Sequence, residues 1–112
     1  MKTLKLFVGC ALLAIAPSAF AGTFVTSAIQ SVYPQADGSF VIKLYTDSAA
    51  CTSTNRPYKY YFVKEGEFGM TADGVKMNYA AALFALGTGK QVIVAFDEST
   101  TSCYVNRLDV ED

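Results

Sequence analysis

The sequence contains no histidine and no tryptophan. Without histidine the chain lacks the usual general base, the commonest metal ligand and every Ser-His or Cys-His nucleophile pair. A carboxylate pair could still act in glycoside hydrolysis, and Glu65 and Glu67 are separated by one glycine. We interpret these two residues as solvated charges of a loop. The expectation is therefore a protein that is not an enzyme and that has no cofactor and no metal site.

Basic residues are also few. The chain has nine lysines and arginines against ten acidic residues, and its formal net charge is −1. A nucleic-acid-binding domain needs a basic patch, whereas these residues are scattered along the chain. Nucleic acid is therefore not an expected partner. No apolar run long enough to cross a bilayer follows residue 21, so a membrane span is not expected either.

The first 21 residues have the three parts of a secretory signal peptide. Lys2 and Lys5 precede an apolar run over 6–16, and the small-residue site Ala-Phe-Ala follows at 19–21. We predict a signal peptide over 1–21, cleaved before Gly22, and a single domain over 22–112. The mature protein is expected in the periplasm or outside the cell.

Cysteine is scarce, and its placement is informative. Cys10 lies in the predicted signal peptide, which leaves Cys51 and Cys103 in a compartment that permits disulfides. A bond between them closes a long loop and contributes about 4 kcal/mol in the chain-entropy model. For a domain of this size that is a large share of the net stability.

The stretch 73–96 predicts a helix, a glycine stop and a strand. Asp73 is expected to cap a helix of about 13 residues that starts at Gly74, and Gly87 is expected to end it. Alternation over 91–96 predicts a buried strand. Because Gly-Thr-Gly-Lys ends a helix instead of starting one, a phosphate loop is not expected. The expected buried stripe consists of Val75, Tyr79, Ala82, Leu83 and Leu86.

A second apolar row lies beside that stripe, so the helix is apolar around most of its circumference. Two interpretations are open: the row completes the rim of the core, or it contacts another subunit or a partner protein. The candidate interface residues are Met77, Ala80, Ala81 and Phe84.

Four further strands are predicted from alternation and turn signals. Segment 24–33 is rich in β-branched residues with imperfect alternation, which indicates a bulge. Asp37-Gly38 predicts a tight hairpin into 39–46. After a polar loop over 47–57, the other two strands are expected at 58–64 and 103–110.

These elements have the order β-β-β-α-β-β and make the chain mainly β with one helix. This order suits a five-stranded Greek-key barrel of the OB-fold type, in which the helix joins the third and fourth strands and covers one end of the barrel. An open antiparallel sheet with one packed helix is the alternative. It fits less well because the helix lies late in the chain.

Seven tyrosines follow residue 21, and tyrosine offers a rigid amphipathic surface for sugars or protein contacts. Strand alternation places Tyr58 and Tyr60 opposite Tyr61, so either the pair or Tyr61 must reach solvent or a partner. Ordinary amphipathic strand tyrosines are the other interpretation. The candidate ligand surface consists of Arg56, Tyr58, Tyr60 and Tyr61.

The run Tyr-Ala-Ala-Ala-Leu-Phe-Ala-Leu-Gly-Thr-Gly-Lys-Gln-Val-Ile-Val from residue 79, with Cys51 before it and Cys103 after it, resembles the OB-fold B subunits of AB5-type toxins, the subtilase cytotoxin kind in particular. The resemblance covers about a third of the mature chain and implies a secreted, ring-forming homo-oligomer that binds glycans. We therefore expect a small non-enzymatic binding module. The alternative is a periplasmic accessory or inhibitor protein that binds another protein.

Overall fold

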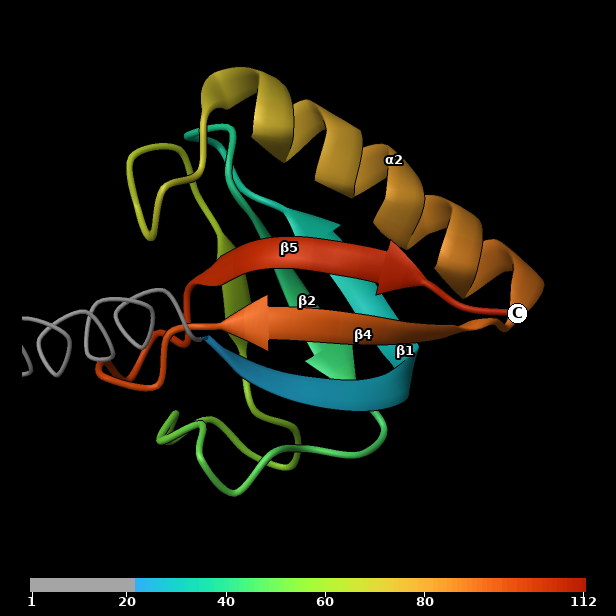
Figure 1. Cartoon of the computed structure of the whole chain (residues 1–112), viewed down its shortest axis with the longest axis horizontal. Coiled ribbons are helices and arrows are strands. Elements are labelled where there is room, and N and C mark those ends of the chain that lie inside the picture. The colour runs from blue at the N-terminus through green and yellow to red at the C-terminus, as the bar shows by residue number, and fades with distance from the viewer. Residues whose placement is uncertain (1–21) are drawn as a thin grey trace, which may run out of the picture.

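The computed structural model describes residues 22–112, so the predicted signal peptide lies outside the described residues. One helix and five strands follow in the predicted order (Figure 1). The elements are β1 (Thr23–Pro34), β2 (Phe40–Leu44), β3 (Tyr61–Val63), α2 (Ala72–Thr88), β4 (Gln91–Phe96) and β5 (Val105–Val110).

The five strands form one antiparallel sheet in the order β3-β2-β1-β4-β5. The long central strand β1 serves both halves: residues 23–28 pair with β4, and residues 29–34 pair with β2. The register shifts between Ile29 and Ser31, which confirms the predicted irregularity in this strand. Figure 1 shows β1 bending there from the front of the sheet toward the back, so the sheet is strongly curved.

Over residues 22–112 the sheet is not closed into a barrel. Its two edge strands nevertheless lie close together: the backbone N–H of Phe62 in β3 donates to the Ser102 carbonyl ahead of β5 over 3.4 Å. The predicted disulfide between Cys51 and Cys103 is present beside this contact, with its Cα atoms 5.7 Å apart. A mainly β fold with one helix is thus confirmed at the level of element content and order.

Helix α2 is longer than predicted at both ends, and two predicted roles are wrong. The N-cap is Thr71, whose Oγ1 accepts the Gly74 N–H at 3.0 Å, and Asp73 lies inside the first turn. The helix continues through Gly87 to Thr88, and its C-cap is Gly89, which has a φ of 73°. A hydroxyl and a carboxylate both cap well, and two glycines lie two residues apart, so the local sequence left both choices open.

The buried side of α2 differs from the predicted stripe. Val75, Ala82 and Ala85 are buried, whereas Leu83 and Leu86 are 42% and 38% exposed. The prediction for these two leucines is wrong because the helix rests on the sheet through the small side chains of Ala82 and Ala85. Such a close contact covers only a narrow arc of the helix.

The β1–β2 hairpin forms as predicted. Gly38 has a φ of 92°, which favours glycine at this turn position. Strand β3 is shorter than expected, because only Tyr61–Val63 of the predicted 58–64 pairs with β2. The core fills the concave side of the sheet beneath α2, and its largest members are Tyr61, Phe40, Phe96, Ile42 and Leu44.

Candidate functional site: an aromatic row and a neighbouring pocket

The predicted ligand residues divide between core and surface. Tyr61 has no exposed surface and packs edge-on against Phe96, with ring centroids 5.4 Å apart. Tyr58 and Tyr60 are partly buried and keep a face on the outside of the sheet. Of the two arrangements that alternation allowed, the structure has the one in which the pair Tyr58 and Tyr60 reaches the surface.

Arg56 is exposed, and its guanidinium is held by its own loop. It donates to the carbonyl oxygens of Ser53 and Asn55 over 3.2 and 2.7 Å. The Ser53 hydroxyl in turn accepts the backbone N–H of Tyr60 at 3.3 Å. The loop therefore fixes the start of the segment that carries the two surface tyrosines.

Tyr61 connects the core to the loop after β2. Its hydroxyl donates to Asp47 Oδ1 at 3.2 Å and accepts the Ser48 N–H at 3.0 Å. Burial, reinforced by the charge of Asp47, raises the pKa of Tyr61 to about 12. Asp47 also accepts the backbone N–H of Lys59 at 3.1 Å. Tyr61 is thus a positioning residue for the surface segment next to it.

Strand register gathers further aromatic residues on the outer face. Tyr33 lies opposite Val41, and Val41 lies opposite Phe62, so these three residues cross β1, β2 and β3 in one line. Val41 is fully buried although it lies outside the core cluster, because aromatic neighbours cover it. Tyr60 packs edge-on against Tyr33 at 5.7 Å and tilted against Phe62 at 6.0 Å.

The same face continues in both directions. Phe62 meets Tyr104 at 6.3 Å, and Tyr58 meets Tyr45 at 6.3 Å. Tyr45 is 61% exposed, so this end of the face projects furthest into solvent. We call this surface the aromatic row; its members are Tyr33, Tyr45, Tyr58, Tyr60, Phe62 and Tyr104, with Lys43 between them.

Lys43 places one positive charge within the aromatic row. Its Nζ lies 5.5 Å from the ring centroid of Tyr33 and 5.8 Å from that of Tyr58. Partial burial, followed by the neighbouring Tyr60 hydroxyl, raises the pKa of Tyr33 to about 12. At neutral pH the Tyr33 hydroxyl is protonated, as it would be at the ordinary tyrosine pKa, and it can donate a hydrogen bond.

Of this surface, sequence reasoning proposed only Tyr58 and Tyr60 as ligand residues, although alternation places Phe62 on the same face as that pair. The remaining members, Tyr33, Tyr45 with Lys43, and Tyr104, lie on three other segments, and no local pattern joins them. One signal was available: the Asp37-Gly38 turn fixes the hairpin register, which places Tyr33 across from Val41 and next to Lys43.

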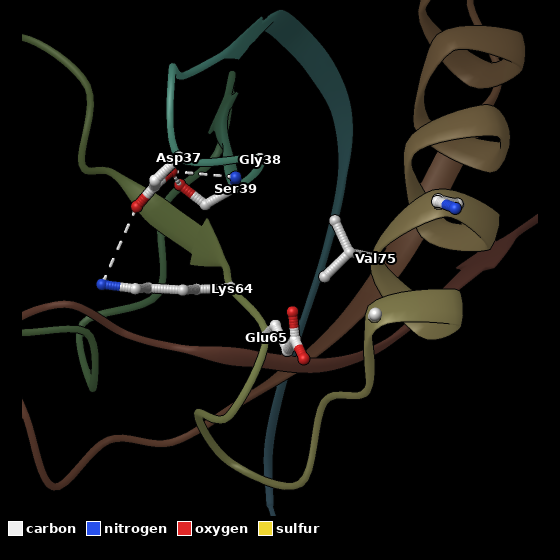
Figure 2. Close-up of a pocket in the computed structure, with 8 residues that line it drawn as sticks. Asp37, Gly38, Ser39, Lys64, Glu65 and Val75 are labelled. Carbon is white, nitrogen blue, oxygen red and sulfur yellow. Dashed lines mark hydrogen bonds and ion pairs between the residues drawn. The ribbon is translucent and has the colours of Figure 1, made fainter.

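A pocket of about 460 Å³ lies between the β1–β2 turn and the first turns of α2 (Figure 2). Figure 2 shows Asp37 and Ser39 on the turn, Val75 on the helix and Glu65 between them. An adjoining cavity of about 180 Å³ has an apolar wall made by Pro34, Phe40, Val75 and Tyr79.

Two of the four charged residues around this pocket, Asp37 and Lys64, interact with each other. Asp37 accepts the Ser39 N–H and hydroxyl at 2.9 and 2.6 Å, and its other oxygen lies 3.8 Å from Lys64 Nζ. These hydrogen bonds from Ser39 hold the pKa of Asp37 below its usual value, so Asp37 is ionised and is unsuited to be a general acid. Glu65 lines the pocket, whereas Glu67 is not part of its wall.

The candidate interface residues of α2 lie mostly on its solvent side. Met77 is 72% exposed and Phe84 is 55% exposed, Ala80 is exposed as well, and Ala81 is half-buried against the core. Of the second apolar row of the helix, only Ala81 therefore belongs to the rim of the core.

Within residues 22–112, no helix is long and apolar enough to cross a membrane, and no three acidic, cysteine or histidine side chains gather into a metal-binding group. No protein-family model and no curated protein matches the chain in sequence.

Proposed function

We propose that the protein is a small, exported, non-enzymatic module that binds glycans through the aromatic row. The observation that carries the proposal is a connected set of five tyrosines and one phenylalanine, with Tyr33 on β1, Phe62 on β3 and the other four beside strand ends, and with Lys43 of β2 over two of the rings. A sugar ring has apolar C–H faces and a rim of hydroxyls. Aromatic faces suit the former, and hydroxyl and ammonium groups suit the latter.

The row is suited to recognition because its side chains are held in place. Tyr60 is fixed by the rings of Tyr33 and Phe62 and by the Ser53 hydroxyl on its backbone N–H. Tyrosine loses little conformational entropy on binding, since it has only two flexible torsions. A surface whose side chains are already ordered loses less free energy on binding, so more of the contact energy contributes to affinity.

We further propose that the fold is an OB-like Greek-key barrel whose seam lies between β3 and β5. The strand order β3-β2-β1-β4-β5, the bend in β1 and the contact between Phe62 and Ser102 support it. In that class of barrel the face of strands two and three is a common site for oligosaccharides. Here Lys43 lies on β2 and Phe62 on β3, and Tyr45, Tyr58 and Tyr60 lie just beyond the ends of these strands. The Cys51–Cys103 disulfide fits export to an oxidising compartment.

The test is a glycan array probed with the protein expressed from Met1, exported and purified with its disulfide intact. We expect binding to a defined glycan class and a loss of about tenfold in affinity for Tyr60→Ala, because one stacked ring contributes about 1.4 kcal/mol. Tyr60→Phe separates the ring from its hydroxyl and should keep most of the affinity.

Phe24→Ala is the matched control, because Phe24 is an aromatic residue 52% exposed at the far end of β1, where it packs against Arg107. Its binding should equal that of the unchanged protein. No binding to any glycan, together with capture of a defined protein that Tyr60→Ala abolishes, would replace this proposal with the protein-binding alternative. Ring formation is not needed for the proposed site, since the row lies within one chain.

A further inference from the structure

The outer side of helix α2 carries a regular pattern of residues. Asp73, Met77, Ala80, Phe84 and Gly87 are all exposed and follow one another at intervals of four, three, four and three. This 4-3 spacing places them on one line along the helix and is the spacing of a seam between two packed helices. We call these five residues the outer seam. In the described chain nothing covers it (Figure 1).

Large and small side chains alternate along the outer seam. Met77 and Phe84 are large, whereas Ala80 and Gly87 are small. If a second copy of the helix packs antiparallel with a twofold axis at Ala82, Met77 of one copy lies level with Gly87 of the other, and Phe84 lies level with Ala80. Each large side chain then meets a space left by a small one, as a self-complementary twofold contact requires.

Charge selects the same orientation. The last turn of α2 has no basic residue, and the Lys90 ammonium just beyond it lies 3.5 Å from Asp112, so an added positive charge at this end of the helix is favourable. The antiparallel arrangement places Lys76 of one copy level with Thr88 in the last turn of the other. A parallel arrangement would instead place Lys76 beside Lys76 and Asp73 beside Asp73, which is unfavourable.

We infer that the outer seam binds a second copy of this chain and forms an antiparallel, twofold-symmetric dimer. The exposed parts of Met77 and Phe84, with Leu83 at the flank, together present on the order of 300 Å² of apolar side chain in each copy, if each large side chain has about 200 Å² to bury. An interface of this size belongs to the small, transient class. We therefore expect a weak dimer that dissociates on dilution. This inference does not depend on what the aromatic row binds.

The first test is sedimentation velocity on the exported, disulfide-bonded protein from about 1 to 200 µM. A monomer–dimer equilibrium is expected. Ala80→Leu is the discriminating variant: it enlarges the exposed apolar area but fills the space that receives Phe84. The inferred register predicts at least tenfold weaker dimerisation, whereas a merely sticky face would associate more strongly. Leucine is a good helix former, so the monomer should keep its melting temperature.

The second test fixes the register by cross-linking and holds even if Ala80→Leu fails to fold. The double variant Met77→Cys/Gly87→Cys should form oxidised dimers, because each new cysteine lies level with the other one of the partner. Met77→Cys alone is the matched control. Its two copies would lie about 15 Å apart along the axis and should not cross-link. A monomer at 200 µM, a particle larger than a dimer, unweakened Ala80→Leu association, or cross-linking of the single variant would each overturn the inference.

Discussion

Removing one buried hydroxyl should loosen both the fold and the candidate binding surface. In Tyr61→Phe the ring stays in the core against Phe96, but Asp47 and the Ser48 N–H each lose their partner on the tyrosine hydroxyl. A bond to a charged group and a bond to a backbone amide are together worth about 2 kcal/mol after partial rehydration of the loop. At about 4–8 °C per kcal/mol for a domain of this size, the midpoint of thermal unfolding should fall by about 8–16 °C.

The pH dependence identifies the hydroxyl as the cause. Below pH 10 the Tyr61 hydroxyl is protonated in both states, so its contribution to stability is fully present. Because the folded pKa is about 12 against 10.0 for the free group, only the unfolded chain ionises between these values. The free energy of unfolding should therefore fall by about 1.4 kcal/mol per pH unit over that window. Tyr33, whose pKa is also raised to about 12, acts in the same direction.

The assay is urea denaturation of the unchanged protein and Tyr61→Phe at pH 7 and from pH 9.5 to 11.5, followed by circular dichroism. We expect the variant to be less stable at pH 7 and to lose less stability on raising the pH. Tyr45→Phe is the control, because Tyr45 is 61% exposed and should change neither quantity. Equal stability of Tyr61→Phe and the unchanged protein at pH 7, or equal pH slopes, would refute the role assigned to this hydroxyl.

Two further predictions concern stability. Replacing both Cys51 and Cys103 by serine opens a loop with a sequence separation of 52 and should lower the free energy of unfolding by about 4 kcal/mol in denaturant titrations, an effect that the reductant-treated parent should reproduce. Gly87→Ala should stabilise the protein by up to about 1 kcal/mol, since Gly87 is helical and has nothing within 4 Å of an added Cβ. Gly89→Ala should instead cost about 1–2 kcal/mol, because Gly89 has a φ of 73°. Thermal melts below 1 µM compare the two variants, and similar effects of both substitutions would contradict the assigned helix end.

Local signals in the sequence predicted the elements that depend on local physics. The Asp37-Gly38 turn predicted the hairpin, and strict alternation predicted β4 at Gln91–Phe96. Cys51 and Cys103, the two cysteines after the predicted signal peptide, were predicted to pair. Each of these depends on one or two residues whose conformational or chemical preference has few competitors.

Features set by competition between neighbours were harder to predict. Thr71 and Asp73 can both cap a helix, and the choice depended on where the chain leaves the glycine-containing connection. The buried arc of α2 was misplaced because an all-round apolar helix gives no preferred side, and close packing through Ala82 and Ala85 decided it. The aromatic row could be predicted only in part, since residues such as Tyr33 and Tyr104 meet through register and curvature.

The edge strands β3 and β5 of the curved sheet matter for the chain before its disulfide forms. An edge strand displays unpaired N–H and C=O groups that can template addition of a strand from another molecule. In the folded protein β3 and β5 partly cover each other, since the Phe62 N–H donates to the Ser102 carbonyl. The adjacent Cys51–Cys103 disulfide keeps these two segments together. Without this covalent bond the edges of both strands can become exposed together. We therefore expect the reduced chain to associate through its strand edges more readily than the disulfide-bonded chain.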